Sequence, residues 1–301
     1  MTQQTRTAAP TASPYRPAPE DARRLMINRL KRMNWAGGAA GWVWLVIVVL
    51  PIYWIVITSF KPQSTYFSTN PLLPPTSPTL INYELVIRNN FIQYFLNSVI
   101  ITVGTIVPAV LLSFMAAFAI VRGGGTRFLK FSNSLLLLGL AIPLQAVIIP
   151  VYLIIIRLRL YDSLLALILP SIAFAIPLSV LVLSNFIRDV PKELFESMRV
   201  DGCTEWGTMW RLAFPLTRPA LVTVSIYNGL NVWNGFLLPL ILTQSPDKRV
   251  LPLALWTFQG QYSINVPAVL ASVVLTTVPI LVLYAIGRRQ LLSGLTAGFG
   301  K

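Results

Sequence analysis

The chain has 301 residues, of which 55% are hydrophobic and 11% are charged, whereas about 25% of the residues in a soluble domain are charged. This composition excludes a soluble enzyme, a disordered protein and a small disulfide-rich scaffold. The 24 Lys and Arg residues outnumber the 10 Asp and Glu residues, but they are spread between long uncharged stretches, which argues against a nucleic acid as partner. The chain has no His and a single Cys, Cys203, so an imidazole base, a His-ligated metal and an internal disulfide are excluded. The sequence predicts an integral membrane protein.

Six uncharged, apolar windows are long enough to cross a bilayer, which requires about 20 residues because lipid offers the backbone no hydrogen bonds. They cover residues 36–60, 97–121, 131–156, 163–187, 220–243 and 266–287. A further uncharged window, residues 62–83, contains five prolines among Ser, Thr and Asn and is predicted to be an extended loop. We therefore predict an all-α fold with six transmembrane helices. Four prolines are expected to kink the third and fourth of them: Pro143, Pro150, Pro170 and Pro177.

The positions of Lys and Arg predict which loops face the cytoplasm. With the N-terminus inside, the inner segments contain 18 Lys and Arg residues and the outer segments contain six. Both termini are therefore predicted to be cytoplasmic, although Arg157 and Arg159 then lie outside. Residues 1–35 are predicted to form a disordered tail whose basic part binds anionic lipid headgroups. Residues 36–301 are predicted to form the transmembrane domain.

The predicted cytoplasmic loop at residues 188–219 has the most informative sequence in the chain. Pro191 is placed to open a helix over residues 192–201, because a proline in the first turn loses no hydrogen bond. Gly202 is placed to end that helix in a conformation with positive φ. Three apolar side chains share one side of this helix: Leu194, Phe195 and Met198.

A second short helix is predicted over residues 205–214, capped by Thr204 and ended by Pro215 and Pro219. Its large apolar side chains are Trp206, Met209, Trp210 and Phe214. We call the whole helix–glycine–helix segment, residues 191–217, the bracket. By composition alone, the bracket also fits an amphipathic loop that rests on the membrane surface.

The order of residues in the bracket resembles the "EAA" loop of permeases from binding-protein-dependent ABC importers. That loop reads Glu-Ala-Ala, two residues, Asp-Gly-Ala, then a hydrophobic stretch and Pro. Four positions match it: Glu196, Asp201, Gly202 and Pro215. Three positions replace its alanines with other residues: Ser197, Met198 and Cys203.

The same resemblance extends from about residue 40 to the C-terminus and favours the maltose-type, carbohydrate-uptake permeases. It is carried by Thr58-Ser59-Phe60-Lys61-Pro62, residues 73–83, Asn97-Ser98, Trp233-Asn234-Gly235-Phe236 and residues 294–298. The resemblance implies a bacterial or archaeal inner-membrane protein. It also implies four other subunits or proteins: a second permease, two ATPase subunits and an extracytoplasmic solute-binding protein. The loop at residues 61–90 is long enough to help dock that binding protein, and it equally fits a passive connector.

In that family the bracket is a coupling helix that sits in a groove on the ATPase subunit. The resemblance implies that Leu194, Phe195 and Met198 fill the groove. Glu196 and Asp201 then make polar contacts around it, and Gly202 sets the bend. The chain has no phosphate-binding loop, since the Gly123-Gly124-Gly125-Thr126 run lacks the spacing and the Lys and fits a flexible turn. We therefore expect no cofactor and no catalysis in this chain, with ATP and Mg bound by the partner ATPase.

Polar residues in the fifth window are the candidates for the substrate pathway. Asn228, Asn231 and Asn234 follow each other at three-residue steps, and carboxamides in mid-membrane rarely face lipid. Three further candidates are Tyr227, Trp233 and, in the third window, Gln145. These side chains fit contacts with sugar hydroxyls and rings, and the amides equally fit hydrogen bonds to the partner permease.

Other functional classes lack the residues that they need. A membrane-embedded enzyme or an ion-driven transporter requires ionisable groups inside the membrane, and the six windows contain none. The main alternative is a permease of the same superfamily for another solute, such as glycerol phosphate or peptides. A phosphate ester favours a cation in the pathway, and no window supplies one.

Overall fold

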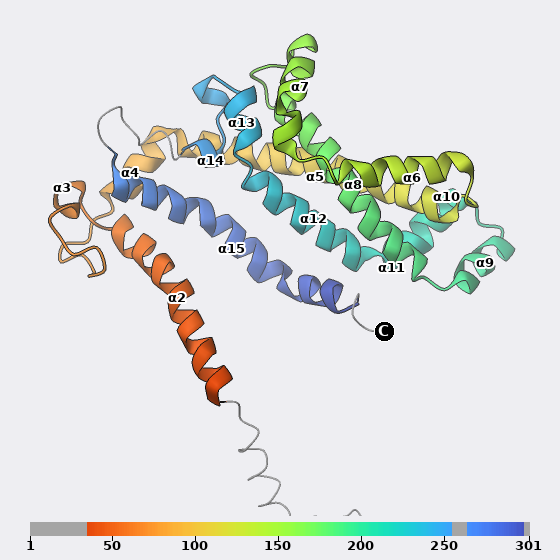
Figure 1. The fold of residues 1–301 in the computed structure, drawn as a ribbon, viewed down its shortest axis with the longest axis horizontal. Coiled ribbons are helices and arrows are strands. Elements are labelled where there is room, and N and C mark those ends of the chain that lie inside the picture. Colours follow the sequence, from red (N-terminus) through yellow and green to blue (C-terminus); the bar gives the residue numbers. More distant parts are fainter. Residues whose placement is uncertain (1–34, 255–263, 298–301) are drawn as a thin grey trace, which may run out of the picture. The chain divides into compact units, whose positions relative to one another are not determined.

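The computed structural model describes residues 35–254 and 264–297, and the secondary structure of these residues is helical, which confirms the all-α part of the predicted fold class. Figure 1 shows its helices along the chain. Their bounds are α2 Trp35–Ser59, α3 Gln63–Tyr66, α4 Ile81–Val86, η1 Ile87–Phe91, α5 Ile92–Arg122, α6 Arg127–Gly139, α7 Leu144–Arg157, α8 Leu165–Arg188, α9 Lys192–Val200, α10 Glu205–Thr208, η2 Met209–Ala213, α11 Phe214–Leu216, α12 Arg218–Trp233, α13 Leu237–Leu242, η3 Pro246–Lys248, α14 Leu251–Ala254 and α15 Val266–Ala297. The tail predicted for residues 1–35 lies outside the described residues, apart from Trp35.

Within the described part of the chain, three helical segments are long and apolar enough to cross a membrane: Gly37–Ser59, Ile81–Arg122 and Leu165–Arg188. A fourth is obtained if the bent pair α6 and α7 is taken as one span. The described apolar part of α15, Val266–Val282, is shorter than a full span. The first, second and fourth predicted windows thus coincide with long helices, and the count of six remains a prediction.

The third predicted span, residues 131–156, is wrong as a single helix. It is divided into α6 and α7, whose axes differ by 107°. Pro143 precedes α7 with an extended backbone (ψ 141°), and a proline has no N–H to continue the preceding helix. The expected kink at Pro143 is therefore a full break, whereas Pro150 lies inside α7.

The fifth predicted span, residues 220–243, is also wrong as a single helix. The helix α12 ends at Trp233, and α13 starts at Leu237 after a tight turn. In this turn the Gly235 amide donates to the Val232 carbonyl at 3.0 Å. A Cβ at Gly235 would lie 3.0 Å from that same oxygen, so a residue with a side chain does not fit without a shift. The turn interrupts the helix beside the predicted pathway residues.

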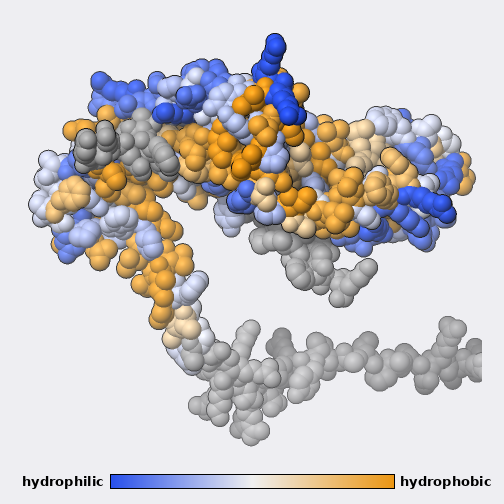
Figure 2. All heavy atoms as spheres, turned by 45° about the horizontal axis from the view of Figure 1, so that its top comes forward, coloured by the Kyte–Doolittle hydropathy of each residue, from blue (hydrophilic) through white to orange (hydrophobic). Residues whose placement is uncertain are grey.

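The chain divides into two compact units, Met1–Tyr53 and Trp54–Lys301. In the second unit, α5 and α8 pack along each other, and α12 packs against α5, α8 and α15 (Figure 1). Phe114 of α5 and Leu183 of α8 are fully buried between these helices. Figure 2 shows hydrophobic side chains over the middle of this unit and hydrophilic ones at the end formed by α9 and α10. This distribution is typical of helices whose middle parts face lipid.

The proline-rich window 62–83 is confirmed as a loop up to Leu80, with the one-turn helix α3 inside it, whereas its last three residues already belong to α4. Lys61, at its start, has only 2% of its surface exposed. Its ammonium group donates to the carbonyl oxygens of Asn70 (2.8 Å) and Pro71 (3.3 Å). A buried ammonium group is costly unless its donors are satisfied, so these bonds hold the loop in one conformation.

Replacing Asn82 with alanine is expected to loosen this loop. The Asn82 amide is buried and donates to the carbonyl oxygens of Ser59 and Lys61, both at 2.8 Å. Losing both bonds leaves two carbonyl groups without this donor, which lowers the free energy of unfolding by about 1–3 kcal/mol. Limited proteolysis of the purified protein should then cleave the loop at least several times faster. Asn70→Ala is the control, because its side chain accepts one exposed bond from Leu72; equal cleavage of both variants would contradict the assignment.

Candidate functional site

The first half of the bracket folds as its sequence predicts. The helix α9 follows Pro191, and Gly202 has a φ of +76°. The Gly202 amide donates to the Arg199 carbonyl at 3.1 Å, and the Cys203 amide donates to the Met198 carbonyl at 2.9 Å. These two bonds form a Schellman motif, which ends a helix with a residue in the left-handed conformation.

The second half of the bracket differs in part from the prediction. The Thr204 hydroxyl accepts a bond from the Gly207 amide at 3.1 Å, which confirms the predicted cap. The helical segment then continues through a π-helical turn, η2, and ends at Leu216 instead of Phe214. Pro215 lies two residues after the π-helical turn η2 and does not end the segment.

The predicted ATPase-contacting residues separate into an exposed and a buried set. Leu194 is 40% exposed, whereas Phe195 is 3% exposed and packs into the core between α5 and α8. Phe195 is thus turned away from the surface on which a partner groove would sit. Met198 is half-buried, and the three polar or glycine positions are exposed: Glu196, Asp201 and Gly202.

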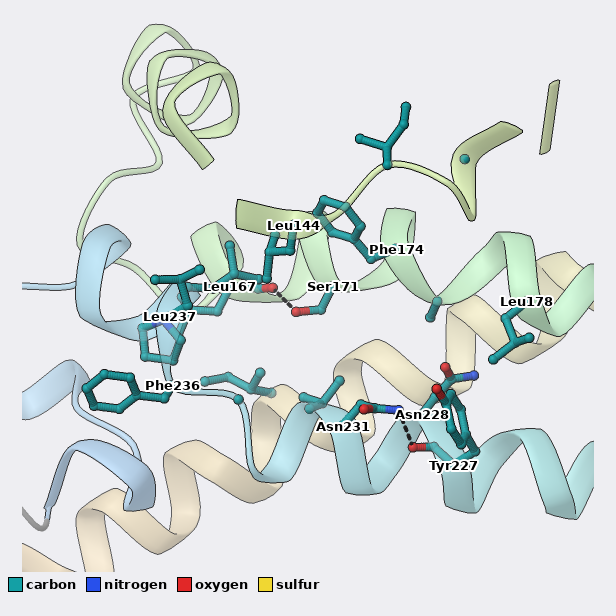
Figure 3. Close-up of a pocket in the computed structure, with 18 of the residues that line it drawn as sticks. Leu144, Leu167, Ser171, Phe174, Leu178, Tyr227, Asn228, Asn231, Phe236 and Leu237 are labelled. Atoms are coloured by element: carbon teal, nitrogen blue, oxygen red, sulfur yellow. Dashed lines mark hydrogen bonds between the residues drawn. The ribbon is translucent and has the colours of Figure 1, made fainter. Parts of the chain in front are cut away.

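A cavity of about 390 Å³ lies between α8, α12 and the turn that joins α6 to α7 (Figure 3). Tyr227, Asn228 and Asn231 line it together, so the structure brings three of the predicted pathway residues to one place. Ser171 of α8 adds a hydroxyl to an otherwise apolar wall, and none of the residues that line this cavity is charged.

The three amides of α12 have different environments. Asn228 is buried, and its Nδ2 donates to the Ser179 hydroxyl of α8 at 2.8 Å, so it joins two helices. Asn231 is exposed to the cavity, and its Nδ2 donates to the Tyr227 carbonyl at 2.9 Å. Asn231 therefore places an exposed amide group in the lining of the cavity.

The remaining predicted pathway residues lie elsewhere. Trp233 and Asn234 line a separate hollow of about 370 Å³ next to α15. Trp233 is buried and packs edge-on against Phe95, with ring centroids 5.9 Å apart. Gln145 is exposed near the start of α7 and does not line either hollow. The sequence spacing of the amides did not reveal this separation, because it depends on which neighbouring helix each side of α12 faces.

Away from the bracket, Asp162 joins two loops of the second unit that are far apart in the sequence. Its carboxylate accepts bonds from the amides of Gln244 (2.8 Å) and Ser245 (3.0 Å) and from the Ser245 hydroxyl. Its own amide donates to the Leu242 carbonyl at 3.0 Å. The bond from the Ser245 hydroxyl, followed by the two amide bonds, lowers the pKa of the Asp162 carboxyl below its ordinary value. The sequence analysis did not identify this residue.

The start of α5 is tied to the same loop. The Asn97 amide donates to the carbonyls of Asp247 and Arg249, both at 2.8 Å. The Ser98 hydroxyl accepts the Leu251 amide at 2.9 Å. The Asn97-Ser98 pair quoted in the family resemblance thus has a structural role at the end of the unit opposite to the bracket.

Replacing Asp162 with asparagine is expected to lower stability by about 1–3 kcal/mol at neutral pH, because the amide cannot accept all three bonds. Because the pKa of Asp162 is lowered in the folded protein, its ionised carboxylate stabilises the fold at pH values above the ordinary pKa of 3.8. This stabilisation is lost as the pH falls through the lowered pKa. The difference in Tm between wild type and Asp162→Asn should therefore be constant from about pH 7 to about pH 5 and shrink below about pH 4. Asp247→Asn, whose exposed carboxylate pairs with Lys248 at 2.6 Å, is the control. A Tm difference that persists at low pH would refute this role.

The comparison with known families decides the assignment. A family model described as the binding-protein-dependent transport system inner membrane component matches residues 109–291, which include the bracket and the cavity-lining helices α8 and α12. The chain belongs to this family. The resemblance predicted from the bracket sequence is confirmed, and the protein is a multi-pass inner-membrane permease component.

The permease has relatives that match most of its length. It is 39% identical, over 85% of its chain and 93% of the relative, to a protein of Caldicellulosiruptor sp. (strain Rt8B.4) named as an ABC transporter permease. It is 32% identical, over 85% of both chains, to a diacetylchitobiose uptake system permease of Streptomyces coelicolor. A crystal structure of a bacterial ABC transporter involved in alginate import matches the fold with a TM-score of 0.74. That match has 18% identity and covers 92% of the permease and 99% of the other chain.

Proposed function

We propose that this permease forms half of the translocation pathway of an ATP-driven, binding-protein-dependent importer for sugars or oligosaccharides. The observation that carries the proposal is the family match over residues 109–291, together with relatives named for the uptake of diacetylchitobiose, trehalose and arabinooligosaccharides. The permease itself does not hydrolyse ATP in this proposal. A second permease, two ATPase subunits that bind ATP and Mg, and an extracytoplasmic binding protein complete the complex.

The proposed topology has six spans and both termini in the cytoplasm. Two features support it. Hydrogen bonds join the loops assigned to the outside, since Asp162 binds residues 242–245 and Asn97 binds residues 247–249. The bracket and the end of α5, both assigned to the inside, meet at the opposite end. In this topology the broken windows form the third and fifth spans, and their breaks border the cavity. The ordered loop at residues 61–90 faces outward and contributes to binding-protein docking.

In the proposed mechanism, the bracket transmits the closing of the ATPase dimer to the helices. Leu194 and Met198 contact the ATPase groove, Glu196 and Asp201 make polar contacts at its rim, and Gly202 fixes the bend. Phe195 has a different part from the one its sequence position implied, because it is buried. It anchors α9 to α5 and α8, so that a force on α9 moves these helices.

The cavity favours an uncharged, polar solute. Its lining combines apolar side chains with a few hydroxyl and amide groups and carries no charge. A desolvated phosphate or carboxylate needs a cation or several strong donors, so glycerol phosphate is the less favoured solute. A sugar matches the lining, because amides bond its hydroxyls and aromatic faces such as Tyr227 cover its ring.

The test is ATP hydrolysis by the complex, purified with its partners and reconstituted in lipid, with and without the binding protein. The solutes are a panel of neutral oligosaccharides, an acidic oligosaccharide, glycerol phosphate and a peptide. Stimulation by one neutral sugar supports the proposal. Co-purification of an ATPase with stimulation only by glycerol phosphate or peptide would overturn the solute class, and absence of any ATPase partner would overturn the coupling role.

A further inference from the structure

One side chain of α5 contacts both helices of the bracket. Arg122, the last residue of α5, has its guanidinium carbon 4.4 Å from the ring centroid of Phe195 in α9. Its Nη2 lies 3.9 Å from Oε1 of Glu205 in α10. The Arg122 side chain is 21% exposed, and cation–π contacts are strongest when they are shielded from water.

Glu205 is shared between two arginines that belong to different parts of the fold. Arg199, in α9 of the bracket, donates to the Glu205 carboxylate at 2.9 Å, and its side chain is 70% exposed. Arg122 lies a full ångström farther from the same oxygen. The buried Nε of Arg122 has no hydrogen-bond partner in the described part of the chain. A buried donor without a partner is costly, so a movement of the bracket that gives the Arg122 Nε an acceptor is favourable.

The helix that carries Arg122 reaches the opposite end of the unit. α5 is continuous from Ile92 to Arg122, and its first turns are tied to the loop at residues 247–251 through Asn97 and Ser98. α5 contains Pro108, which removes one backbone hydrogen bond, but the helix is unbroken over its 31 residues and so connects a displacement at one end to the other end. Arg122 is therefore one point at which the bracket contacts the helix that leads to the outer loops, beside Phe114, which packs on Trp210 and Phe214.

We propose that Arg122 is a positioning residue that transmits the movement of the bracket to α5. It does so through its contact with the Phe195 ring and through a change in its distance to Glu205 when the bracket moves. This inference rests on the proposed function, because it assigns a step of coupling between ATP hydrolysis and solute movement. Arg122 acts on the bracket and touches neither ATP nor the solute.

The experiment compares three variants in the reconstituted complex: Arg122→Gln, Arg122→Lys and the control Arg199→Gln. Arg199→Gln removes the shorter contact to Glu205 and leaves the contact between α5 and α9. We expect Arg122→Gln to raise the ATP hydrolysed per solute imported by about three- to ten-fold, with the ATPase still co-purifying. Arg122→Lys keeps the cation over the ring and should restore the ratio to within about two-fold of wild type. The ratio of ATP hydrolysed to solute imported in Arg199→Gln should also stay within about two-fold of wild type.

A second measurement uses Cys203, the only cysteine of the chain, as a reporter in the bracket. A spin label on Cys203 should be more mobile in Arg122→Gln than in wild type, and Arg122→Lys should reverse this change. An unchanged import ratio in Arg122→Gln, equal effects of Arg122→Gln and Arg199→Gln, or loss of the ATPase from Arg122→Gln would overturn the inference. If the wild-type complex imports none of the solutes tested, the proposed function fails. The label then still decides the role of Arg122, because equal mobility in wild type and Arg122→Gln refutes it.

Discussion

Exchanging Leu194 for aspartate is expected to reduce ATP-driven solute uptake by at least ten-fold while the permease remains inserted in the membrane. Leu194 is an exposed apolar side chain of α9 and precedes the buried Phe195. A charge placed in an apolar groove loses its water without gaining a partner, and residues at the centre of an interface commonly contribute about 2 kcal/mol or more, or about thirty-fold in affinity. Uptake into proteoliposomes and the amount of co-purified ATPase measure the effect.

The matched control is Lys192→Asp, which introduces the same side chain about 200° around the axis of α9. It should leave uptake within about two-fold of wild type. A larger change, deletion of residues 196–202, removes the Schellman turn and should uncouple ATP hydrolysis from uptake altogether. Wild-type uptake by either Leu194→Asp or the deletion variant would show that the bracket is not the coupling element.

The substitution Phe195→Ala tests the buried side of α9, whereas Leu194→Asp tests its exposed side. Phe195 belongs to the core formed with α5 and α8, and removing a buried aromatic ring typically costs about 3–5 kcal/mol of stability. Leu194→Asp, on the surface, should lower the Tm little. The contrast therefore distinguishes a residue that contacts the partner from one that holds the bracket in place.

The helices and the bracket were predictable because their signals are local. Apolar stretches of about 20 residues, a proline before α9 and a glycine where φ must be positive each act within a few residues. Gly202 and Thr204 therefore adopt the predicted conformation and the predicted cap. The direction of Phe195 was not predictable, because which apolar side chain of an amphipathic helix turns inward depends on the position of α5 and α8.

The extent of the break at Pro143, where only a kink was expected, the break at Gly235 and the long-range ties escaped prediction for a related reason. Hydropathy measures composition and does not detect that Pro143 and Gly235 stop helices within apolar windows. The bonds of Asp162 and Asn97 join residues more than eighty positions apart, and the periodicity of the sequence carries no trace of them. The separation of Asn231 from Asn234 follows from the packing of α12 against α8 and α15, and it can be tested directly.

Exchanging Asn231 for tryptophan is expected to block solute passage. The largest side chain at this exposed position extends into the cavity of about 390 Å³ that Asn231 lines with Tyr227 and Asn228. Uptake should fall at least ten-fold, while ATP hydrolysis stimulated by the binding protein persists, since the bracket is unchanged. Asn231→Ala removes one group that can form a hydrogen bond with the solute, and such a bond contributes about 0.5–1.5 kcal/mol. The KM for uptake should therefore rise by about two- to ten-fold.

Asn234, the residue that directly follows α12, provides a closely matched control. Asn231 and Asn234 are both exposed amides whose Nδ2 donates to the carbonyl four residues earlier, at 2.9 and 2.8 Å. They differ in the hollow that they line, because Asn234 lies beyond the end of α12 and next to α15. If the solute passes through the first cavity, Asn234→Trp and Asn234→Ala should leave the KM near the wild-type value. Equal losses from the Asn231 and Asn234 variants would mean that the solute does not pass through the cavity between α8 and α12, and that the amides of α12 bind the partner permease instead.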